Sequence, residues 1–336
     1  MYPVLLLAAL LIGCLLAVQS SVNLQLNKSV GTPYGASTVQ LSVATVLLAV
    51  LALVVGGIGA VSLIGGVPTW HLLGGLASPL YITSGILLFP RLGALAAVGL
   101  FVTGQMFASL ALDLFGLLGV PRQPLTLGIV LGAVAVLAGI TTIIKAQRAP
   151  KPTTAPAASP GPSPGPGGGT VTATKAAPAS AKERTGNVGW IVLGLIAGAV
   201  LPIQGAVNAR LRADLHAPIT VAMISFIVAT LTIAIVLVAL LALGRTPTPK
   251  FEPLRRMPWW GWLGGACAAA YVTATFMLIP TIGAATTVAL TVTGQQLASA
   301  GIDSGGLFRM PRRALTPPRI AGLVLLIVGS ALVQLT

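Results

Sequence analysis

Acidic side chains are the scarcest functional groups in this sequence. Its 336 residues include 5 Asp and Glu against 19 Lys and Arg, and charged residues make up only 7% of it. A soluble domain carries roughly 25% charged residues, so water is not the solvent for most of this chain. The carboxylates are too few for a carboxylate-rich catalytic or metal centre, and 2 His and 2 Cys cannot provide a four-ligand zinc site. We therefore expect neither a metal nor a cofactor.

The signature motifs of membrane enzymes are also missing. The sequence has no Walker motif, no nucleophile elbow and no His-Glu-x-x-His, so ATP hydrolysis and membrane proteolysis have no support. A formal net charge of +14 would suggest nucleic-acid binding in a soluble protein. Here the cations lie almost entirely between apolar runs, where membrane topology is their commonest explanation. We expect no enzyme and no nucleic-acid partner.

Long apolar runs dominate what is present. The sequence is 55% hydrophobic with a mean hydropathy of +0.96, and a transmembrane helix needs about 20 apolar residues. An all-α polytopic protein of the lipid bilayer is therefore expected. Between the fifth and sixth runs, residues 146–187 are rich in Pro, Ala, Gly, Ser and Thr and predict a disordered linker. The ten runs lie near 3–26, 36–58, 70–89, 92–112, 125–144, 188–210, 218–243, 259–279, 282–302 and 317–335.

The first five runs and the last five are repeats of each other. Many rare residue types coincide in the same order, which indicates a duplication of one five-helix unit. We expect the first repeat at 1–145 and the second at 188–336. At an offset of 185 residues, Gln19, Asn23 and Pro33 match Gln204, Asn208 and Pro218; at an offset of 190, Pro68, Trp70, Tyr81, Thr103-Gly104-Gln105 and Asp113 match Pro258, Trp260, Tyr271, Thr293-Gly294-Gln295 and Asp303.

The two repeats are expected to have opposite orientations in the membrane. Each has an odd number of spans, and the linker is too polar to cross. Loop charges agree: sixteen of the 19 cations fall on one side of the predicted topology, and only Arg122, Arg210 and Arg212 fall on the other. By the positive-inside rule the cationic side, including the linker, is cytoplasmic and both termini lie outside. The sequence thus predicts a multi-pass protein of the cell (inner) membrane.

Several of the repeated residues form a known pattern in the second repeat. The pattern consists of Gln204-x-x-x-Asn208, Pro258-Trp-Trp-x-Trp-x-Gly264-Gly265, Pro280-x-x-Gly283, Thr293-Gly294-Gln295, Ser299-x-x-x-Asp303-x-x-Gly306 and Gly322 followed seven residues later by Gly329. It resembles the YdcZ-like inner-membrane exporter family of the drug/metabolite transporter superfamily, in a fused two-domain form. The first repeat departs from the pattern, with Thr69 and Leu72 where the second has Trp259 and Trp262.

The resemblance has implications for fold and function. It implies the EamA-like arrangement of inverted five-helix repeats, and it implies export or facilitated passage of a small metabolite or drug-like molecule. Single-domain members of that family are thought to pair antiparallel, so fusion of both halves in one chain is compatible with a monomer.

Polar side chains at membrane depth are the candidates for a substrate site. Inverted repeats place such a site near the midplane on their shared axis, and an unpaired amide in hydrocarbon is costly. The i, i+4 spacing puts Gln19 and Asn23 on one helix face, and Gln204 and Asn208 repeat this. The alternative is that these amides only join helices by hydrogen bonds. Four further candidates fall near mid-span in matching helices: Gln105, Gln295, Tyr81 and Tyr271.

Asp113 and Asp303 are the only repeated carboxylates, and both fall near helix ends. They are candidates for coupling or gating, with a loop-ordering contact to Arg122 or Arg309 as the alternative. No acidic residue lies near mid-span, whereas exporters of hydrophobic cations in the small-multidrug branch rely on a central glutamate. A neutral or zwitterionic solute held by amides and hydroxyls fits this composition better.

We therefore expect a secondary transporter that works by alternating access between the repeats. Two alternatives stay open. In a non-transporting scaffold or regulator the paired amides would only hold helices together, and in a channel or lipid scramblase the rates would not saturate. The sequence does not identify the solute, the direction of transport or a coupling ion.

Overall fold

Helices account for all regular structure in the part of the chain that the structure describes. The computed structural model describes residues 2–148, 181–282 and 284–335, and no strand occurs among them. The elements are α1 (Tyr2–Val30), α2 (Pro33–Val54), η1 (Gly57–Gly66), η2 (Thr69–Ala77), α3 (Ser78–Leu92), α4 (Ala94–Phe115), η3 (Leu117–Gly119), α5 (Leu127–Arg148), α6 (Ala181–Leu215), α7 (Pro218–Ala242), η4 (Glu252–Arg256), η5 (Trp259–Trp262), α8 (Leu263–Ile282), α9 (Ala284–Gly305), η6 (Leu307–Arg309) and α10 (Pro317–Leu335).

The chain is a multi-pass membrane protein. Eight helical segments of the described residues are long and apolar enough to cross a bilayer, and they correspond to α1, α2, η2 with α3, α4, α5, α6, α7 and α10. Ten spans were expected and eight are found among the described residues, so the count of ten stays a prediction. Helices α8 and α9 occupy the positions of the other two; α9 contains Gln295, Gln296 and a run of threonines, which lower its hydropathy.

Most of the predicted linker lies outside the described residues. The expected linker began at 146, but α5 continues to Arg148, and α6 begins at Ala181 rather than at 188. Residues 149–180 are not described. The domain boundaries therefore stay predictions.

Glycine and proline define several helix ends. Gly93 has φ +78° and separates α3 from α4. A side chain is strained at that φ, and a Cβ there would also lie 2.9 Å from a carboxylate oxygen of Asp303. Pro33 and Pro218 stand in the first turn of α2 and α7, where a missing N–H is tolerated. Pro33 and Pro218 are equivalent residues of the two repeats.

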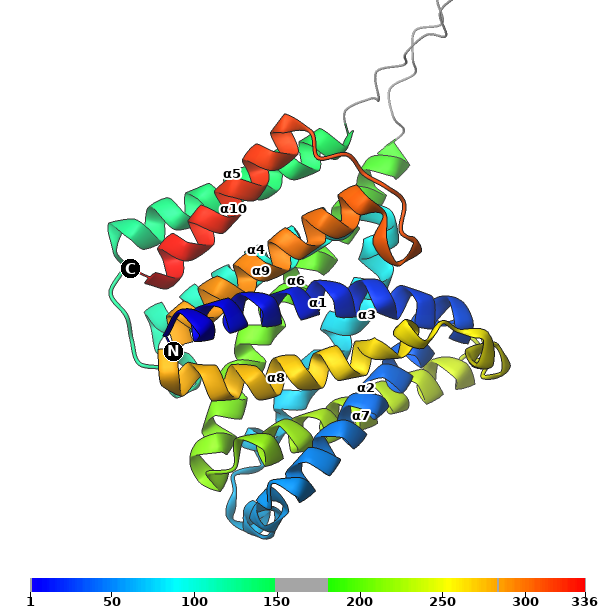
Figure 1. Ribbon diagram of the computed structural model, residues 1–336, viewed down its shortest axis with the longest axis vertical. Helices are drawn as coiled ribbons and strands as arrows, with labels where there is room; N and C mark the ends of the chain where they lie inside the picture. The colour runs from blue at the N-terminus through cyan, green and yellow to red at the C-terminus, as the bar shows by residue number, and fades with distance from the viewer. Residues whose placement is uncertain (1, 149–180, 283, 336) are drawn as a thin grey trace, which may run out of the picture.

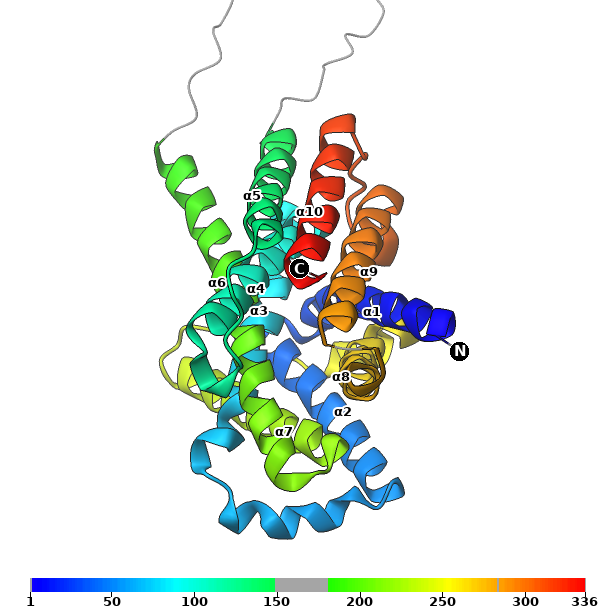
Figure 2. The ribbon, with the colours of Figure 1, turned by 90° about the vertical axis from the view of Figure 1, so that its left-hand side faces the viewer.

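The helices are arranged along one long axis. Helices α5 and α10 lie side by side at one end, α2 and α7 lie together towards the other, and the remaining helices lie between them (Figures 1 and 2). Helix α4 packs on α6, and α9 packs on α1. The largest fully buried side chains include Phe89 and Phe101 on α3 and α4, so the core centres on this middle region.

Small residues let these helices approach closely. A Cβ on Gly198 of α6 would lie 2.0 Å from the Phe101 carbonyl oxygen of α4, and a Cβ on Gly13 of α1 would lie 2.0 Å from the Thr291 carbonyl oxygen of α9. Glycines of α5 and α10 likewise face each other, with Gly132 against the Gly329 carbonyl. Small residues at helix interfaces are typical of membrane bundles, where packing replaces the hydrophobic effect.

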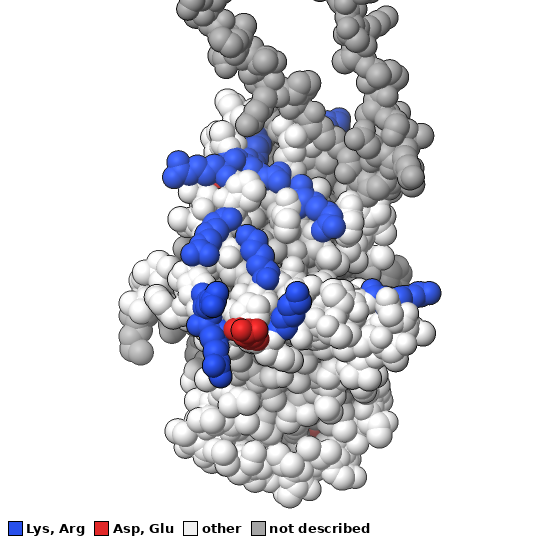
Figure 3. Space-filling model, turned by 90° about the vertical axis from the view of Figure 1, so that its right-hand side faces the viewer, with Lys and Arg blue, Asp and Glu red and all other residues white. Residues whose placement is uncertain are grey.

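Basic side chains gather on one side of the molecule, where several helices begin or finish; this side runs beside the long axis. Figure 3 views the end at which α1 finishes and α8 and α10 begin, and shows many Lys and Arg side chains on it. Hydrogen bonds join several loops there: the Lys250 N–H donates to the Val30 carbonyl at 2.9 Å, and Arg313 Nη2 donates to the Arg91 carbonyl at 3.3 Å. We call this the basic end. The opposite end holds Arg122 and Arg210, which bind carbonyls of the α4–α5 connection.

Candidate functional site

Two clusters of buried polar side chains occupy matching positions in the fold. The first, which we call the α6 cluster, consists of Gln204 and Asn208 of α6, Ser78 of α3 and Ser225 of α7. Gln204 and Ser78 exchange hydrogen bonds of 2.9 and 3.0 Å, and Gln204 Nε2 also donates to Ser225 at 3.3 Å. Asn208 Nδ2 donates to the same serine at 3.2 Å. Gln204 is therefore satisfied within the protein, whereas Asn208 Oδ1 is buried without a hydrogen-bond partner.

The second, which we call the α1 cluster, consists of Gln19, Asn23 and Asn27 of α1 and Gln40 of α2. Its three α1 members follow each other at i, i+4 and i+8, so they form one stripe on the helix. The carbonyl oxygens of all four amides are buried and have no hydrogen-bond partner. Gln40 Nε2 makes only a long bond of 3.4 Å to the Gly264 carbonyl of α8. The two clusters therefore differ sharply in how well their polar atoms are paired.

Glycines bring each asparagine against the facing helix. A Cβ on Gly74 would lie 2.1 Å from Asn208 Oδ1, and a Cβ on Gly264 would lie 2.1 Å from Asn23 Oδ1. Gly74 and Gly264 are equivalent at the offset of 190 residues. Both amides thus occupy the same type of place, at a contact too close for any residue but glycine.

Two replaced partners explain why the clusters differ. At the offset of 185, Ser225 corresponds to Gln40, and at the offset of 190, Ser78 corresponds to Ala268. The hydroxyls that satisfy Gln204 and Asn208 therefore have no equivalent beside Gln19 and Asn23. Ser78, Ser225 and Gln40 were absent from the predicted site. Serine is common in membrane helices, and only the structure identifies its partner.

The predicted tyrosine and glutamine candidates are only partly brought together. Gln295 of α9 is 1% exposed and donates to the Tyr81 hydroxyl of α3 at 2.9 Å, and Tyr81 stacks against Phe101. The matching Gln105 of α4 is half-buried, and no hydrogen bond of its side chain occurs among the described residues. Tyr271 lies close to Tyr81. The neighbour of Gln295, Gln296, is fully buried and none of its amide atoms has a partner.

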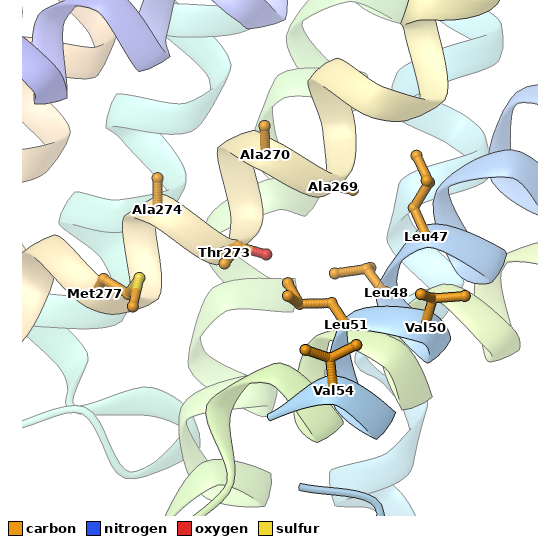
Figure 4. Close-up of a pocket in the computed structure, with 10 residues that line it drawn as sticks. All are labelled: Leu47, Leu48, Val50, Leu51, Val54, Ala269, Ala270, Thr273, Ala274 and Met277. Carbon is orange, nitrogen blue, oxygen red and sulfur yellow. The ribbon is translucent and has the colours of Figure 1, made fainter. Parts of the chain in front are cut away.

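A cavity lies between α2 and α8. Its volume is about 400 Å³, and it is wide open to the outer surface of the two helices. Thr273 contributes the one polar side chain of its lining, and the Thr273 hydroxyl is buried without a hydrogen bond. In Figure 4 that hydroxyl points towards Leu48 and Leu51 across the cavity. The lining residues are Leu47, Leu48, Val50, Leu51, Val54, Ala269, Ala270, Thr273, Ala274 and Met277.

The two repeated carboxylates have different surroundings. Asp303 is fully buried, pairs with Arg319 Nη2 at 2.6 Å and accepts the N–H groups of Ala94 and Leu95 at 2.8 and 3.2 Å. It therefore caps the start of α4, where a negative charge is favoured by the helix dipole. The expected contact with Arg309 is replaced by this one, because Arg319 of α10 reaches the carboxylate while Arg309 lies 5.9 Å from the Trp260 ring centre.

Asp113 has no ion pair among the described residues. Its side chain is only half-buried, and the expected partner Arg122 instead donates to the Phe115 carbonyl at 3.3 Å. The position equivalent to Arg319 is Ile129, which explains why Asp113 lacks a matching cation. Whether either carboxylate couples or gates transport stays a prediction.

A contact between a histidine and an aspartate lies at the end opposite the basic one. His71 is 8% exposed and its Nδ1 lies 2.5 Å from Asp214 Oδ2. The pair joins η2 to α6. Its equivalent positions are Gly261 and Ser29, so it belongs to one repeat only and could not be found from the repeat pattern. No group of three metal-ligating side chains occurs among the described residues.

Comparison with known proteins identifies a family. The family described as "Putative inner membrane exporter, YdcZ" matches residues 4–142 and again residues 189–332. No curated protein sequence matches the chain. A crystal structure of another protein resembles it with a TM-score of 0.53 and 18% identity, covering 98% of this chain and 96% of that one. At this identity the likeness concerns the fold alone.

Proposed function

Because the chain belongs to the YdcZ family of inner membrane exporters, we propose that it is a secondary transporter of a small metabolite or drug-like molecule. It works by alternating access between two inverted five-helix repeats, with the substrate held by amides and hydroxyls near the midplane. The observation that carries this proposal is the α1 cluster: four buried amide oxygens without partners in a protein of an exporter family. Scaffold amides are expected to be paired, because unpaired ones destabilise the fold.

Reciprocal contacts support the inverted repeat. A two-fold relation requires that if residue i of one repeat meets j of the other, the equivalents of i and j also meet. Gly104 faces the Leu195 carbonyl and Gly294 faces the Leu10 carbonyl, which is such a pair. The equivalent residues Thr45 and Thr230 meet each other at 2.9 Å between their hydroxyl oxygens, as residues beside the axis would.

The distribution of charge supports the topology. The basic end is assigned to the cytoplasm, and the linker and both termini follow from it as predicted. The end with Arg122, Arg210 and the His71–Asp214 pair then faces outward. Asp303 and Asp113 belong to opposite ends in this arrangement, consistent with their equivalence under inversion.

Reconstitution with the Gln105→Leu/Gln295→Leu double variant tests the proposal. We expect saturable uptake of at least one member of a panel of small amines, amino acids and sugars by wild-type proteoliposomes, and its loss in the double variant. Thr142→Val, which removes a hydroxyl from the outer helix α5, is the matched control and should transport normally. Retained transport by a correctly folded double variant would refute the assignment of Gln105 and Gln295.

Two further outcomes separate the alternatives. Uptake that rises linearly with concentration would indicate a channel or scramblase instead of a carrier. Absence of any substrate-dependent protection of single cysteines introduced at 105 and 295, in a background without Cys14 and Cys267, would favour a scaffold.

A further inference from the structure

We propose that the α1 cluster and the cavity between α2 and α8 form one binding site for a neutral amphipathic solute. Its head donates hydrogen bonds to the amide oxygens, and its apolar body fills the cavity. This inference rests on the proposed function and adds to it the chemical class of the substrate and the half of the protein that binds it.

The head must be a donor, because the unpaired atoms are acceptors. Gln19 Oε1, Asn23 Oδ1 and Gln40 Oε1 all lack partners, and Gln19, Asn23 and Gln40 are 3%, 1% and 1% exposed. Buried acceptors gain most from N–H or O–H groups that replace lost water. A primary amide, with two N–H donors on one nitrogen, matches several convergent carbonyl oxygens.

The head must also be uncharged. No carboxylate belongs to the α1 cluster or lines the cavity, and the buried repeated acid, Asp303, is already neutralised by Arg319. A cation buried without a counter-charge pays a large desolvation penalty. The site therefore favours a neutral donor over an ammonium group.

The body must be apolar. Nine of the ten side chains that line the cavity are Leu, Val, Ala or Met, and Thr273 adds one hydroxyl. Of the residues that line the cavity, Val54 and Met277 are 78% and 65% exposed. The cavity therefore opens on the surface that faces lipid, and an amphipathic solute can enter it from the bilayer.

The cluster and the cavity lie one after the other along the same two helices. On α8, Gly265 packs against the Gln40 carbonyl, and Ala269, one turn further, lines the cavity. On α2, Gln40 precedes Leu47 by seven residues, which is roughly 10 Å along a helix. A solute that bridges both parts therefore needs a spacer of a few methylene groups between head and body.

The other repeat does not offer the same site. Gln204 is paired with Ser78 and Ser225, and Asn208 Nδ2 donates to Ser225, so that Asn208 Oδ1 alone lacks a partner. Thr83, which corresponds to Thr273, pairs with the Ser37 hydroxyl at 3.0 Å, whereas the residue equivalent to Ser37 is Ala222. The α1 cluster thus holds four unpaired amide oxygens against one, Asn208 Oδ1, in the α6 cluster, so we expect one binding site per chain.

A series of four probes tests the two chemical requirements. Binding to the detergent-purified full-length protein is measured by isothermal titration calorimetry. We expect 4-phenylbutanamide to bind saturably with one site per chain. Its N,N-dimethyl derivative, which has no N–H, and butanamide, which has no apolar body, should each bind about tenfold weaker or less, a ratio typical of one lost group of contacts. Equal binding of the dimethyl derivative would overturn the proposal, and tighter binding of 4-phenylbutylamine would overturn the neutral head.

A swap of partners tests the location. Gln40→Ser with Ala268→Ser gives Gln19 Oε1 a hydroxyl donor, as Ser78 gives Gln204 Oε1, and removes the Gln40 Oε1 acceptor, so it should weaken 4-phenylbutanamide binding about tenfold while the protein stays folded. Ala270→Phe, which fills the cavity from an exposed position of α8, should have a similar effect. Thr142→Val on α5 should bind as wild type.

The outcomes distinguish this site from the transport function itself. Undiminished binding in both the swap and Ala270→Phe would place the site elsewhere and overturn this inference, even if the protein transports solutes. Conversely, wild-type protein that binds 4-phenylbutanamide as expected but transports no member of the panel would refute the proposed function and leave the site intact.

Discussion

The α6 cluster and the α1 cluster began as copies of one arrangement, and they now differ in how their polar atoms are paired. Both keep the Gln and Asn pair and the facing glycine. Ser78 and Ser225 leave only Asn208 Oδ1 unpaired in one copy, whereas four amide oxygens are unpaired in the other, where Ala268 and Gln40 replace the two serines. A duplicated unit can keep one copy for stability while the second copy accepts unpaired polar atoms. Such strain is retained where it serves a function.

The two ends of the bundle repeat this lesson. Asp303 is enclosed by Arg319 and the start of α4, whereas Asp113 is half-buried without an ion pair among the described residues. At the basic end the duplicated carboxylate, Asp303, joins α9 to α10 and to the start of α4. At the other end the same residue stays free of a cation, and the His71–Asp214 pair joins α6 to η2 instead.

The largest expected difference between the halves is in how much stability is lost when Asp303 or Asp113 is replaced. Asp303→Ala leaves the Arg319 guanidinium buried without its counter-ion, which typically costs about 3–5 kcal/mol. Asp113→Ala removes no ion pair and should cost under about 1 kcal/mol. Unfolding in mixed detergent and SDS, followed by tryptophan fluorescence, measures both values. Equal losses would show that the asymmetry seen in the structure has no energetic counterpart.

A second pair of variants should show the halves to be alike. A Cβ on Gly198 or on Gly13 would lie 2.0 Å from a carbonyl oxygen of the facing helix, and overpacking of this kind costs about 1–3 kcal/mol. We expect Gly198→Ala and Gly13→Ala to destabilise the protein to a similar extent in the same unfolding assay. Gly205→Ala, with no atom within 4 Å of the added Cβ, is the control and should be neutral or stabilising.

The sequence predicted the shared features of the halves better than their differences. Rare residues such as Trp70 and Asp113 reveal a duplication because they recur in order. The partner of a side chain is decided by three-dimensional packing, and an offset in sequence carries no information on it. Arg319 was counted only as a cytoplasmic cation, and the structure places it inside, 4% exposed, against Asp303.

The same limit applies to the candidate site. Gln19, Asn23, Gln204 and Asn208 could be proposed from helical spacing, because amides are rare in apolar runs. The cavity between α2 and α8 is lined almost entirely by Leu, Val and Ala, which are also the commonest lipid-facing residues. Nothing in their pattern separates a cavity wall from an ordinary membrane surface.

The two mid-span glutamines provide a smaller test of asymmetry. Gln295→Leu breaks the hydrogen bond to the Tyr81 hydroxyl and leaves that hydroxyl without a donor, which should cost about 1 kcal/mol. Gln105→Leu breaks no such bond among the described residues and should change stability by about 0.5 kcal/mol or less. Both variants are compared by thermal unfolding in detergent. A larger loss for Gln105→Leu would mean that Gln105 has a structural partner of its own.

The smallest expected effect on stability has the opposite sign. Gln40→Ser with Ala268→Ser should stabilise the protein by about 0.5–1 kcal/mol, since it gives Gln19 the hydroxyl donor that Gln204 has in Ser78 and removes the unpaired Gln40 Oε1. Ser78→Ala in the α6 cluster should destabilise by a similar amount because Gln204 loses its closest partner. A protein that gains stability when its unpaired amides are satisfied, and binds its solute less tightly for the same reason, carries those amides for binding. If the swap instead destabilises the fold, Gln40 has a packing role at Gly264 that outweighs its unpaired oxygen, and the difference between the halves is one of structure alone.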